Sequence, residues 1–274
     1  MWNRRQLLQG ACSLSLGALQ GCALSSPKFQ PSGLVQHLRG VGAVDVLLLG
    51  EQHDAPEHQA LHQAVVQAWS LAQNLSALVL EMADAGHDTR GLSPQASPAQ
   101  VQARLAWSDS AWPWAAYGPA VMAAVAQGVV VMGGNLPRTR HRDVMRHAAW
   151  DARVSPEVRL SLETAVREGH CNLLPASQWP AMTRIQIARD VRMADSIVTA
   201  HQHDQRTVIL LCGLQHAHKR QGVPAHLPTS LRCHSVRLTA DGYDASQAYD
   251  TVWRTTPTPE KDHCAALEKQ LQKR

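Results

Sequence analysis

Short apolar runs, each bounded by polar or turn-forming residues, constrain most strongly how this chain can fold. Four of the runs are almost continuously apolar, and a fifth is weaker. They lack the alternation of polar and apolar residues that marks a sheet with one wet face. The runs therefore predict buried strands of a mostly parallel sheet that helices cover on both faces. In chain order, the expected strands are 44–49, 77–80, 129–132, 207–211 and 234–238.

The segments between these runs have helical patterns. Residues 58–72 carry apolar side chains at helical spacing, with Asp54 as the expected N-cap and Pro56 in the first turn. We expect 92–126 to form helices packed over the sheet. About 136–202 should be a helical subdomain inserted before the later strands, with 179–200 as its longest helix. The expected fold class is α/β.

The N-terminus has the pattern of an export signal. Two arginines, Arg4 and Arg5, precede a moderately apolar run that ends in Leu19-Gln20-Gly21-Cys22. This order predicts a signal peptide over 1–21 and a lipid anchor on Cys22. A secretory peptide with an incidental cysteine and a short buried helix remain alternatives. The paired arginines leave both twin-arginine and ordinary Sec export open.

Ala23 follows the anchor cysteine, and a residue other than Asp at that place favours sorting to the outer membrane. We therefore expect a bacterial envelope lipoprotein that faces the periplasm and touches the membrane through its lipid. Residues 22–33 would be the lipidated N-terminus and its Ser/Pro tether. The domain would span 34–256, and the polar tail 257–274 would be a solvated helix or a frayed end.

Charge and cysteine content narrow the class of protein. The formal charge of +4 falls to +2 without Arg4 and Arg5, and the basic residues are scattered, so a nucleic-acid partner is not expected. The four cysteines after the anchor allow up to two disulfides in an oxidising compartment. Cys212 ends an apolar run and should be a buried thiol. Cys233 and Cys264 lie in polar segments and are candidates to pair.

Two expected strands end in the same motif. Gly50-Glu51-Gln52-His53 follows the first strand, and Gly213-Leu214-Gln215-His216 follows the fourth. A third acid, Glu81, directly follows the second strand. Because ligands bind beyond the carboxyl ends of parallel strands, we expect these side chains to converge there. They would suit a metal, acid/base chemistry or hydrogen bonding to a charged ligand, whereas helix capping is the structural alternative.

Aromatic residues cluster at 112–119. Trp114 and Tyr117 share a face if a helix begins near Pro113, and Trp112 lies just before it. Flat rings beside a phenol could pack on a porphyrin, with the phenol oxygen free to hold ferric iron. Packing in the core is the rival interpretation.

Further polar candidates lie around the same expected edge of the sheet. Asn135 and Arg138 follow the third strand, and Arg138 could meet a carboxylate such as a propionate. His170 follows a glycine that stops a helix and could equally be a helix-dipole partner. Arg189 could contact the ligand or form a structural pair with Asp190.

In this order the motifs resemble the ChaN-like haem-binding family over nearly the whole mature chain. The matching pieces are 49–54, 80–82, 112–113 with Tyr117 and Pro119, 135–138, 169–171, 188–190 with 193–194, and 213–216 with 222–224. The resemblance implies an iron-related envelope lipoprotein in which two protomers can enclose stacked haems. A Tyr would hold iron, and a partner's His would contact propionates. Tyr117 matches best, with Tyr243 and Tyr249 as alternatives.

The expected partners are accordingly haem, the membrane, a second copy of the chain and an outer-membrane haem receptor. The last Gly-x-x-His departs from the family pattern, since Leu214-Gln215 replaces a smaller, more polar pair. The motifs also resemble a wider superfamily that includes Tiki-type metalloproteases and erythromycin esterase-like hydrolases. In that rival hypothesis His53 and His216 hold a divalent metal or act as bases, while Glu51 or Glu81 activates water.

Overall fold

The computed structural model describes residues 30–240, 246–259 and 262–271. The expected signal peptide, Cys22 and most of the tether lie outside these residues, as does Tyr243. Among the described helices, none combines the length and apolar character needed to cross a membrane.

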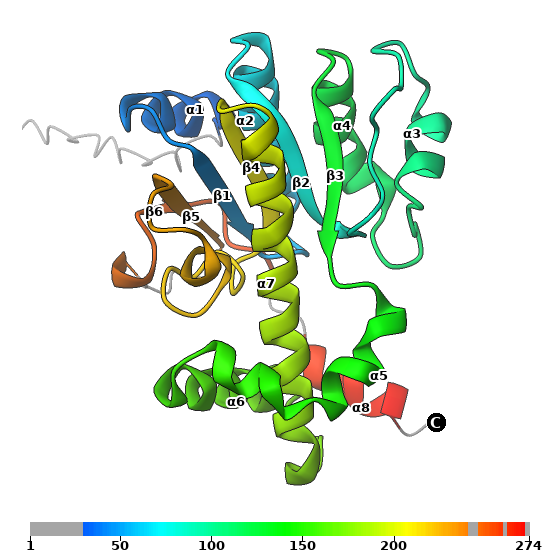
Figure 1. Ribbon diagram of the computed structural model, residues 1–274, viewed down its shortest axis with the longest axis vertical. Helices are drawn as coiled ribbons and strands as arrows, with labels where there is room; N and C mark the ends of the chain where they lie inside the picture. Colours follow the sequence, from blue (N-terminus) through cyan, green and yellow to red (C-terminus); the bar gives the residue numbers. More distant parts are fainter. Residues whose placement is uncertain (1–29, 241–245, 260–261, 272–274) are drawn as a thin grey trace, which may run out of the picture.

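A single six-stranded sheet forms the centre of the molecule (Figure 1). Its order is β3-β2-β4-β1-β5-β6, and every strand pairing is parallel, which confirms the α/β prediction. Each of the five expected runs is a strand, and β6 is an additional edge strand. The strands are β1 (Val46–Glu51), β2 (Leu75–Asp84), β3 (Val130–Asn135), β4 (Thr207–Gly213), β5 (Cys233–Thr239) and β6 (Thr251–Arg254).

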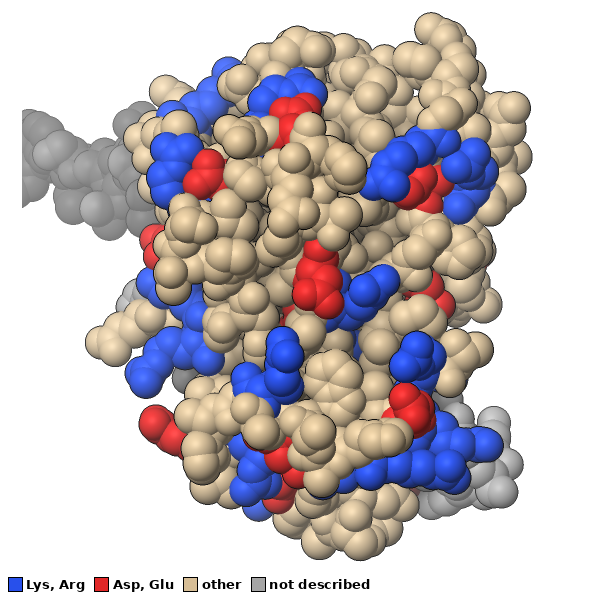
Figure 2. Space-filling view, in the orientation of Figure 1, with Lys and Arg blue, Asp and Glu red and all other residues tan. Residues whose placement is uncertain are grey.

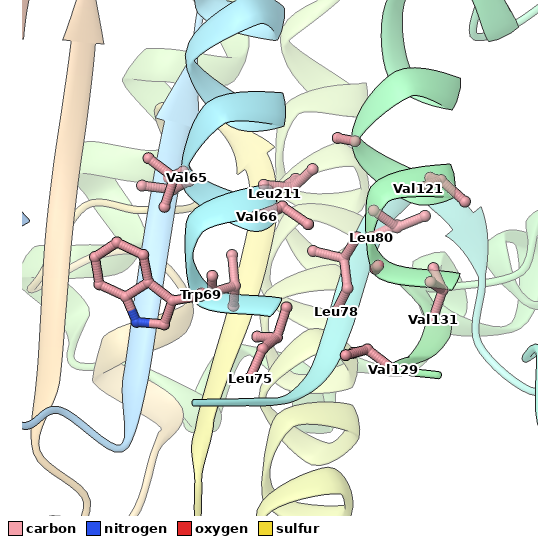
Figure 3. Close-up of a cluster of buried hydrophobic side chains, with 14 of the residues drawn as sticks. Val65, Val66, Trp69, Leu75, Leu78, Leu80, Val121, Val129, Val131 and Leu211 are labelled. Carbon is pink, nitrogen blue, oxygen red and sulfur yellow. The ribbon is translucent and has the colours of Figure 1, made fainter. Parts of the chain in front are cut away.

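Both faces of the sheet are buried, as the unbroken apolar runs predict. Leu47 and Leu49 point into a cluster with α2 and α4, whereas Val46 and Leu48 point to the opposite face, against α7. Figure 3 shows the first cluster, where Val65 of α2 and Val121 of α4 lie over strand side chains. The helices on that side are α1 (Pro31–Gly40), α2 (Pro56–Leu71), α3 (Pro98–Arg104) and α4 (Trp114–Val125).

The segment between β3 and β4 is helical, as expected. Its long helix α7 packs against the sheet with one half and against α5 and α6 with the other (Figure 1). This arrangement sets a helical layer beyond the carboxyl ends of the strands. The elements are α5 (Arg138–Arg146), η1 (Ala148–Arg153), α6 (Pro156–Gly169), η2 (Ala176–Gln178) and α7 (Trp179–His203). The remaining short elements are η3 (Val223–His226), η4 (Ser246–Ala248) and α8 (His263–Leu271).

Two local expectations at helix starts are wrong. Ala55, not Asp54, is the N-cap of α2, and no side chain caps that end because alanine has no side-chain acceptor. Helix α1 begins at Pro31, inside the range 22–33 assigned to the tether, because Leu34 and Leu38 bury their side chains in the core.

The candidate pairing of Cys233 with Cys264 does not form. Cys264, in α8, is bonded to Cys171, and Cys233 is a free thiol at the start of β5. Cys212 is a buried free thiol, as predicted. The polar tail therefore includes a helix that a covalent bond ties to the end of α6.

The surface in Figure 2 carries Lys and Arg interspersed with Asp and Glu. Several of these charges form exposed ion pairs, including Arg90 with Asp88 and Arg206 with Asp204. Such exposed pairs contribute little to stability, so the fold depends on its two buried layers.

Candidate functional site

The two Gly-x-x-His motifs lie side by side because β1 and β4 are neighbours. Glu51 is paired with Gly213 in the register of the sheet. A Cβ at Gly213 would lie 2.8 Å from His53 Nε2, and one at Gly50 would lie 2.8 Å from the Cβ of Ala217. Glycine is therefore required at both strand ends for close approach, and the first motif folds its histidine over the second.

Glu51 is the centre of a buried hydrogen-bond network below His53. Its Oε1 accepts hydrogen bonds from His53 Nδ1 at 2.8 Å and from the Tyr117 hydroxyl at 2.6 Å. Its Oε2 accepts one from Gln59 Nε2 at 2.7 Å, and His62 Nδ1 lies 3.6 Å away. The carboxylate is thus surrounded by donors although it is almost wholly buried.

This network shifts the pKa of its members. Burial acts to raise the pKa of Glu51, but the charges of His62 and His53 and the hydrogen bonds from His53 and Tyr117 hold it below its usual value. For His53, burial acts to lower the pKa, whereas the bond to Glu51 and the charge of Glu81 raise it above the usual value. The ionised Glu51 thereby fixes His53 with Nδ1 as donor and leaves Nε2 for another partner.

The free phenol oxygen expected at Tyr117 is not found in this structure. The side chain is 2% exposed, its hydroxyl donates to Glu51, and it does not line the cavity described below. Burial and the neighbouring Glu51 charge raise the pKa of Tyr117 far above its usual value, which opposes formation of a phenolate. Tyr249 is also buried, and its hydroxyl donates to the carbonyl of Leu214 at 2.9 Å.

A second buried carboxylate, Glu81, joins β2 to β4 and α7. Its Oε2 accepts the backbone N–H of Gly213 at 2.6 Å, and Arg189 donates to its Oε1. Arg189 also donates to Asn135 Oδ1 at 2.9 Å, while Asn135 donates to the backbone carbonyl of Glu81 at 2.8 Å. Against the effect of burial, the charges of His216, Arg189 and His53 hold the pKa of Glu81 well below its usual value.

His216 lies between two carboxylates. Its Nδ1 is 2.5 Å from Asp190 Oδ1, and its Nε2 is 3.4 Å from Glu81 Oε1. Although burial acts to lower it, these two charges raise the pKa of His216 to about 9, so the ring is an imidazolium at neutral pH. Arg189 and Asp190 therefore contact different partners, and the structural pair considered for them does not form.

An open cavity of about 800 Å³ lies between this edge of the sheet and the helical layer. Six of the predicted site residues line it, from three strand ends and two helices. They are Glu51, His53, Glu81, His170, Arg189 and His216. The opposite wall includes apolar side chains of α6, namely Leu162, Ala165 and Val166. The predicted convergence at the carboxyl edge is thus present.

The other predicted site residues do not line the cavity. Trp112 contacts the His53 ring edge-on, with 4.8 Å between the ring centroids. Asn135 accepts a hydrogen bond from Arg189, which does line the cavity. Trp114 packs against Trp107 and covers Gly118, where a Cβ would be 2.5 Å from its ring, so the core interpretation holds for it. Arg138 is exposed at the start of α5.

Five residues of the site had not been singled out as ligand-binding candidates. Gln59 and His62 face inward from α2, Asp190 and Gln186 face inward from α7, and His263 lines the cavity from α8. A weak signal existed for His62, which lies on the apolar face of its helix. Within the described ranges, no group of three or more His, Cys, Asp and Glu is arranged to hold a metal ion.

Comparisons with known proteins agree with this architecture. Residues 38–227 match the family described as haem-binding uptake, Tiki superfamily, ChaN. None of the curated proteins matches the chain. A solved structure, "Cofacial heme binding to ChaN of Campylobacter jejuni", is 23% identical and has a TM-score of 0.64, with 81% of this chain and 90% of that chain covered.

A second solved structure, the type III effector HopBA1, is 13% identical with a TM-score of 0.44, and 85% of this chain and 96% of that chain are covered. The family match extends over more than half of the sequence and includes β1 to β4 with both Gly-x-x-His motifs. The chain therefore belongs to the haem-binding uptake family, ChaN, of the Tiki superfamily.

Proposed function

We propose that this protein binds haem in the cavity between the sheet edge and the helical layer, as part of iron uptake. The observation that carries the proposal is the composition of that cavity in a chain of this family. Its volume of about 800 Å³ lies within the roughly 300–1,000 Å³ of small-molecule sites. An apolar wall from α6 suits a porphyrin face, and imidazoles opposite it suit iron.

His53 is the best-placed iron ligand by geometry. Its Nδ1 bonds to Glu51, its side chain is 39% exposed, and its Nε2 lies over Gly213 at the cavity edge. Metal-binding histidines usually donate their other ring N–H to a carboxylate, which orients the ring and increases its basicity. Tyr117 as the ligand stays a prediction, and that role would require its hydroxyl to leave Glu51.

Haem titration tests this proposal. Purified protein should develop a saturable Soret band, and His53→Ala should weaken binding by about tenfold or more, because it removes an oriented ligand. His147→Ala is the matched control, since His147 is exposed and bonds within α5. A protein that gives no specific Soret band would refute haem binding. Equal affinity of His53→Ala and the wild type would remove His53 from the ligand role.

We also propose that the protein is an envelope lipoprotein anchored through Cys22. The support is the order of Arg4, Arg5, the apolar run and the lipobox in the sequence. In cells grown with labelled palmitate, the wild-type protein should become labelled and the Cys22→Ala variant should not. The labelled protein should fractionate with the outer membrane. Export of an unlabelled, cleaved wild type would contradict the anchor.

A cofacial haem pair in a dimer is a further part of the proposal. The Campylobacter jejuni protein binds haem cofacially, and the cavity of this chain is partly open to solvent. Sedimentation velocity should show a monomer without haem and a dimer holding two haems after titration. A haem-loaded monomer would contradict the cofacial arrangement without contradicting haem binding.

Hydrolysis is the second candidate function, because His53 and His216 line one cavity and each bonds to a carboxylate, Glu51 and Asp190 respectively. Both ring nitrogens of His216 face carboxylates, Nδ1 towards Asp190 and Nε2 towards Glu81, so neither is directed towards a metal ion. The geometry thus favours binding over metallohydrolysis. Divalent-metal-dependent cleavage of peptide or ester substrates that is lost in Glu51→Gln would reverse this preference.

A further inference from the structure

The positive charge of this chain is concentrated in helix α5. Four arginines and one aspartate give its nine residues, Arg138–Arg146, a charge of +3. Because residues 22–274 together carry a charge of +2, the part of this range outside α5 has a net charge of −1. In Figure 2, basic side chains gather at the lower right of the molecule, where Figure 1 places α5. One short helix therefore holds the whole excess of positive charge.

Three of these arginines form a line on the outer side of α5. Arg138, Arg142 and Arg146 are spaced by four residues, so they share one face of the helix. That face is opposite Val144, which is buried against α7, and all three arginines are exposed. At a rise of 1.5 Å per residue, the line extends over about 12 Å. We call these three residues the arginine stripe.

The fold does not neutralise the arginine stripe. Among the described residues, no carboxylate forms an ion pair with it, and Asp143 of the same helix contacts Arg140 and His147 instead. Like charges four residues apart repel one another on a helix. Arg138 also adds a positive charge to the first turn, at the positive end of the helix dipole, where α5 has no acidic residue; only Arg146, in the last turn, is favourably placed. The stripe as a whole thus opposes the stability of α5, so a role in folding does not account for it.

We propose that the arginine stripe is a docking surface for a partner protein that presents a row of carboxylates. A guanidinium group can bind a carboxylate through two parallel hydrogen bonds. Exposed arginines in a line therefore match acidic side chains repeated about 6 Å apart, as on one face of an acidic helix. The inference goes beyond haem binding. Helix α5 begins three residues after Asn135, which bonds to Arg189 of the cavity wall, so a docked partner would lie beside the cavity.

A protein partner agrees better with the geometry than a membrane surface does. Helix α1 is the first described element after the proposed anchor at Cys22, and residues 22–30 reach at most about 30 Å. In Figure 1, α1 and α5 lie at opposite ends of the molecule. Helix α5 packs on the first half of α7, whose 25 residues make it about 37 Å long. An anchored molecule would therefore keep α1 near the bilayer and turn the stripe away from it.

Binding of a designed acidic peptide tests the inference. The probe is a fluorescein-labelled, alanine-rich helical peptide with glutamate at every fourth position, and its control has the same composition with the glutamates spread around the helix. In anisotropy titrations, the wild type should bind the probe more tightly than the control peptide. Replacement of all three stripe arginines by glutamine should weaken binding of the probe about tenfold, as expected for the loss of three exposed ion pairs. The matched variant Arg39→Gln/Arg220→Gln/Arg254→Gln removes the same charge from other exposed positions and should bind like the wild type.

The outcomes distinguish the possible partners. The inference is overturned if the stripe variant binds the probe as tightly as the wild type does, or if the wild type does not distinguish the two peptides. Stripe-dependent binding to phosphatidylglycerol vesicles without binding to the peptide would assign the stripe to a membrane and overturn it as well. A haem-free dimer that sedimentation shows for the wild type and not for the stripe variant would assign it to self-association, with the same consequence.

Two further measurements separate docking from folding and from haem binding. The free energy of unfolding in urea should be at least as high in the stripe variant as in the wild type, because repulsion between like charges is removed. A lower value would give the stripe a structural role and contradict the inference. Haem titration should give the same Soret band in both proteins, since the stripe does not line the cavity. Loss of that band in the stripe variant alone would assign the arginines to haem and overturn the docking role.

Discussion

Replacing Tyr117 with Phe distinguishes a structural phenol from an iron ligand. The substitution removes only the hydroxyl that donates to Glu51 at 2.6 Å. The Phe ring can keep the contacts of Tyr117 with Trp107 and Trp112, so little cavity is created. Glu51 would retain its hydrogen bonds to His53 and Gln59.

The expected loss of stability follows from the type of bond. A hydrogen bond to a charged group contributes about 1.5–3 kcal/mol, so Tyr117→Phe should lower the free energy of unfolding by that amount. For a domain of this size, Tm falls by roughly 2–4 °C for each kcal/mol of stability lost, so we expect Tm to fall by about 3–12 °C. Urea or thermal unfolding of the haem-free protein measures it.

The haem complex supplies the decisive second readout. If Tyr117 only supports Glu51, the ferric spectrum of Tyr117→Phe should match that of the wild type. If Tyr117 binds iron, the phenolate charge-transfer band of the wild type should disappear in the variant. Unchanged stability together with loss of that band would refute our interpretation of the Tyr117–Glu51 bond.

Three further predictions concern the same site. The pKa of His216 is raised from 6.5 to about 9 in the folded protein, which corresponds to about 3 kcal/mol of stabilisation. This stabilisation should be complete below pH 6.5 and lost as the pH rises towards 9. Urea unfolding should therefore show a free energy of unfolding that declines over this range in the wild type and not in His216→Gln. Arg189→Met leaves a buried carboxylate without its cation and should lower the free energy of unfolding by about 3 kcal/mol or more, measured by the same method. Gly213→Ala should displace the His53 ring and weaken haem binding in titrations, whereas Gly40→Ala, where a Cβ meets nothing within 4 Å, should not.

The sheet could be predicted because burial on both faces leaves a strong mark in the sequence. The observed β1 and β3 nevertheless extend beyond the apolar runs to Glu51 and Asn135, since the last residues of these strands carry polar side chains of the site. Strand β2 continues to Asp84, so Glu81 lies inside this strand and not directly after it as expected. Strand β6 left no such mark: only Thr251 of its four residues is buried, and the strand lies at the edge of the sheet.

The site residues at the ends of strands could be predicted from the sequence, whereas those on helices could not. Glu51, His53, Glu81 and His216 converge as expected because parallel strands end at one edge. Asp190 had been considered as a partner of its neighbour, but adjacent residues on a helix do not face each other. Its true partner comes from a strand end 26 residues further along the chain, which single-sequence spacing cannot reveal.

The two Gly-x-x-His motifs are alike in sequence and differ in chemistry. Helix α7 brings Asp190 against His216, whose side chain is only 5% exposed. Each ring nitrogen of His216 faces a carboxylate, that of Asp190 or that of Glu81. The His53 side chain is 39% exposed, and its Nε2 lies at the cavity edge next to Gly213. A buried imidazolium between two acids holds strand and helix together, whereas an open, carboxylate-supported imidazole can bind iron. We therefore expect ligand binding to depend on the first motif and the rigidity of the cavity edge to depend on the second.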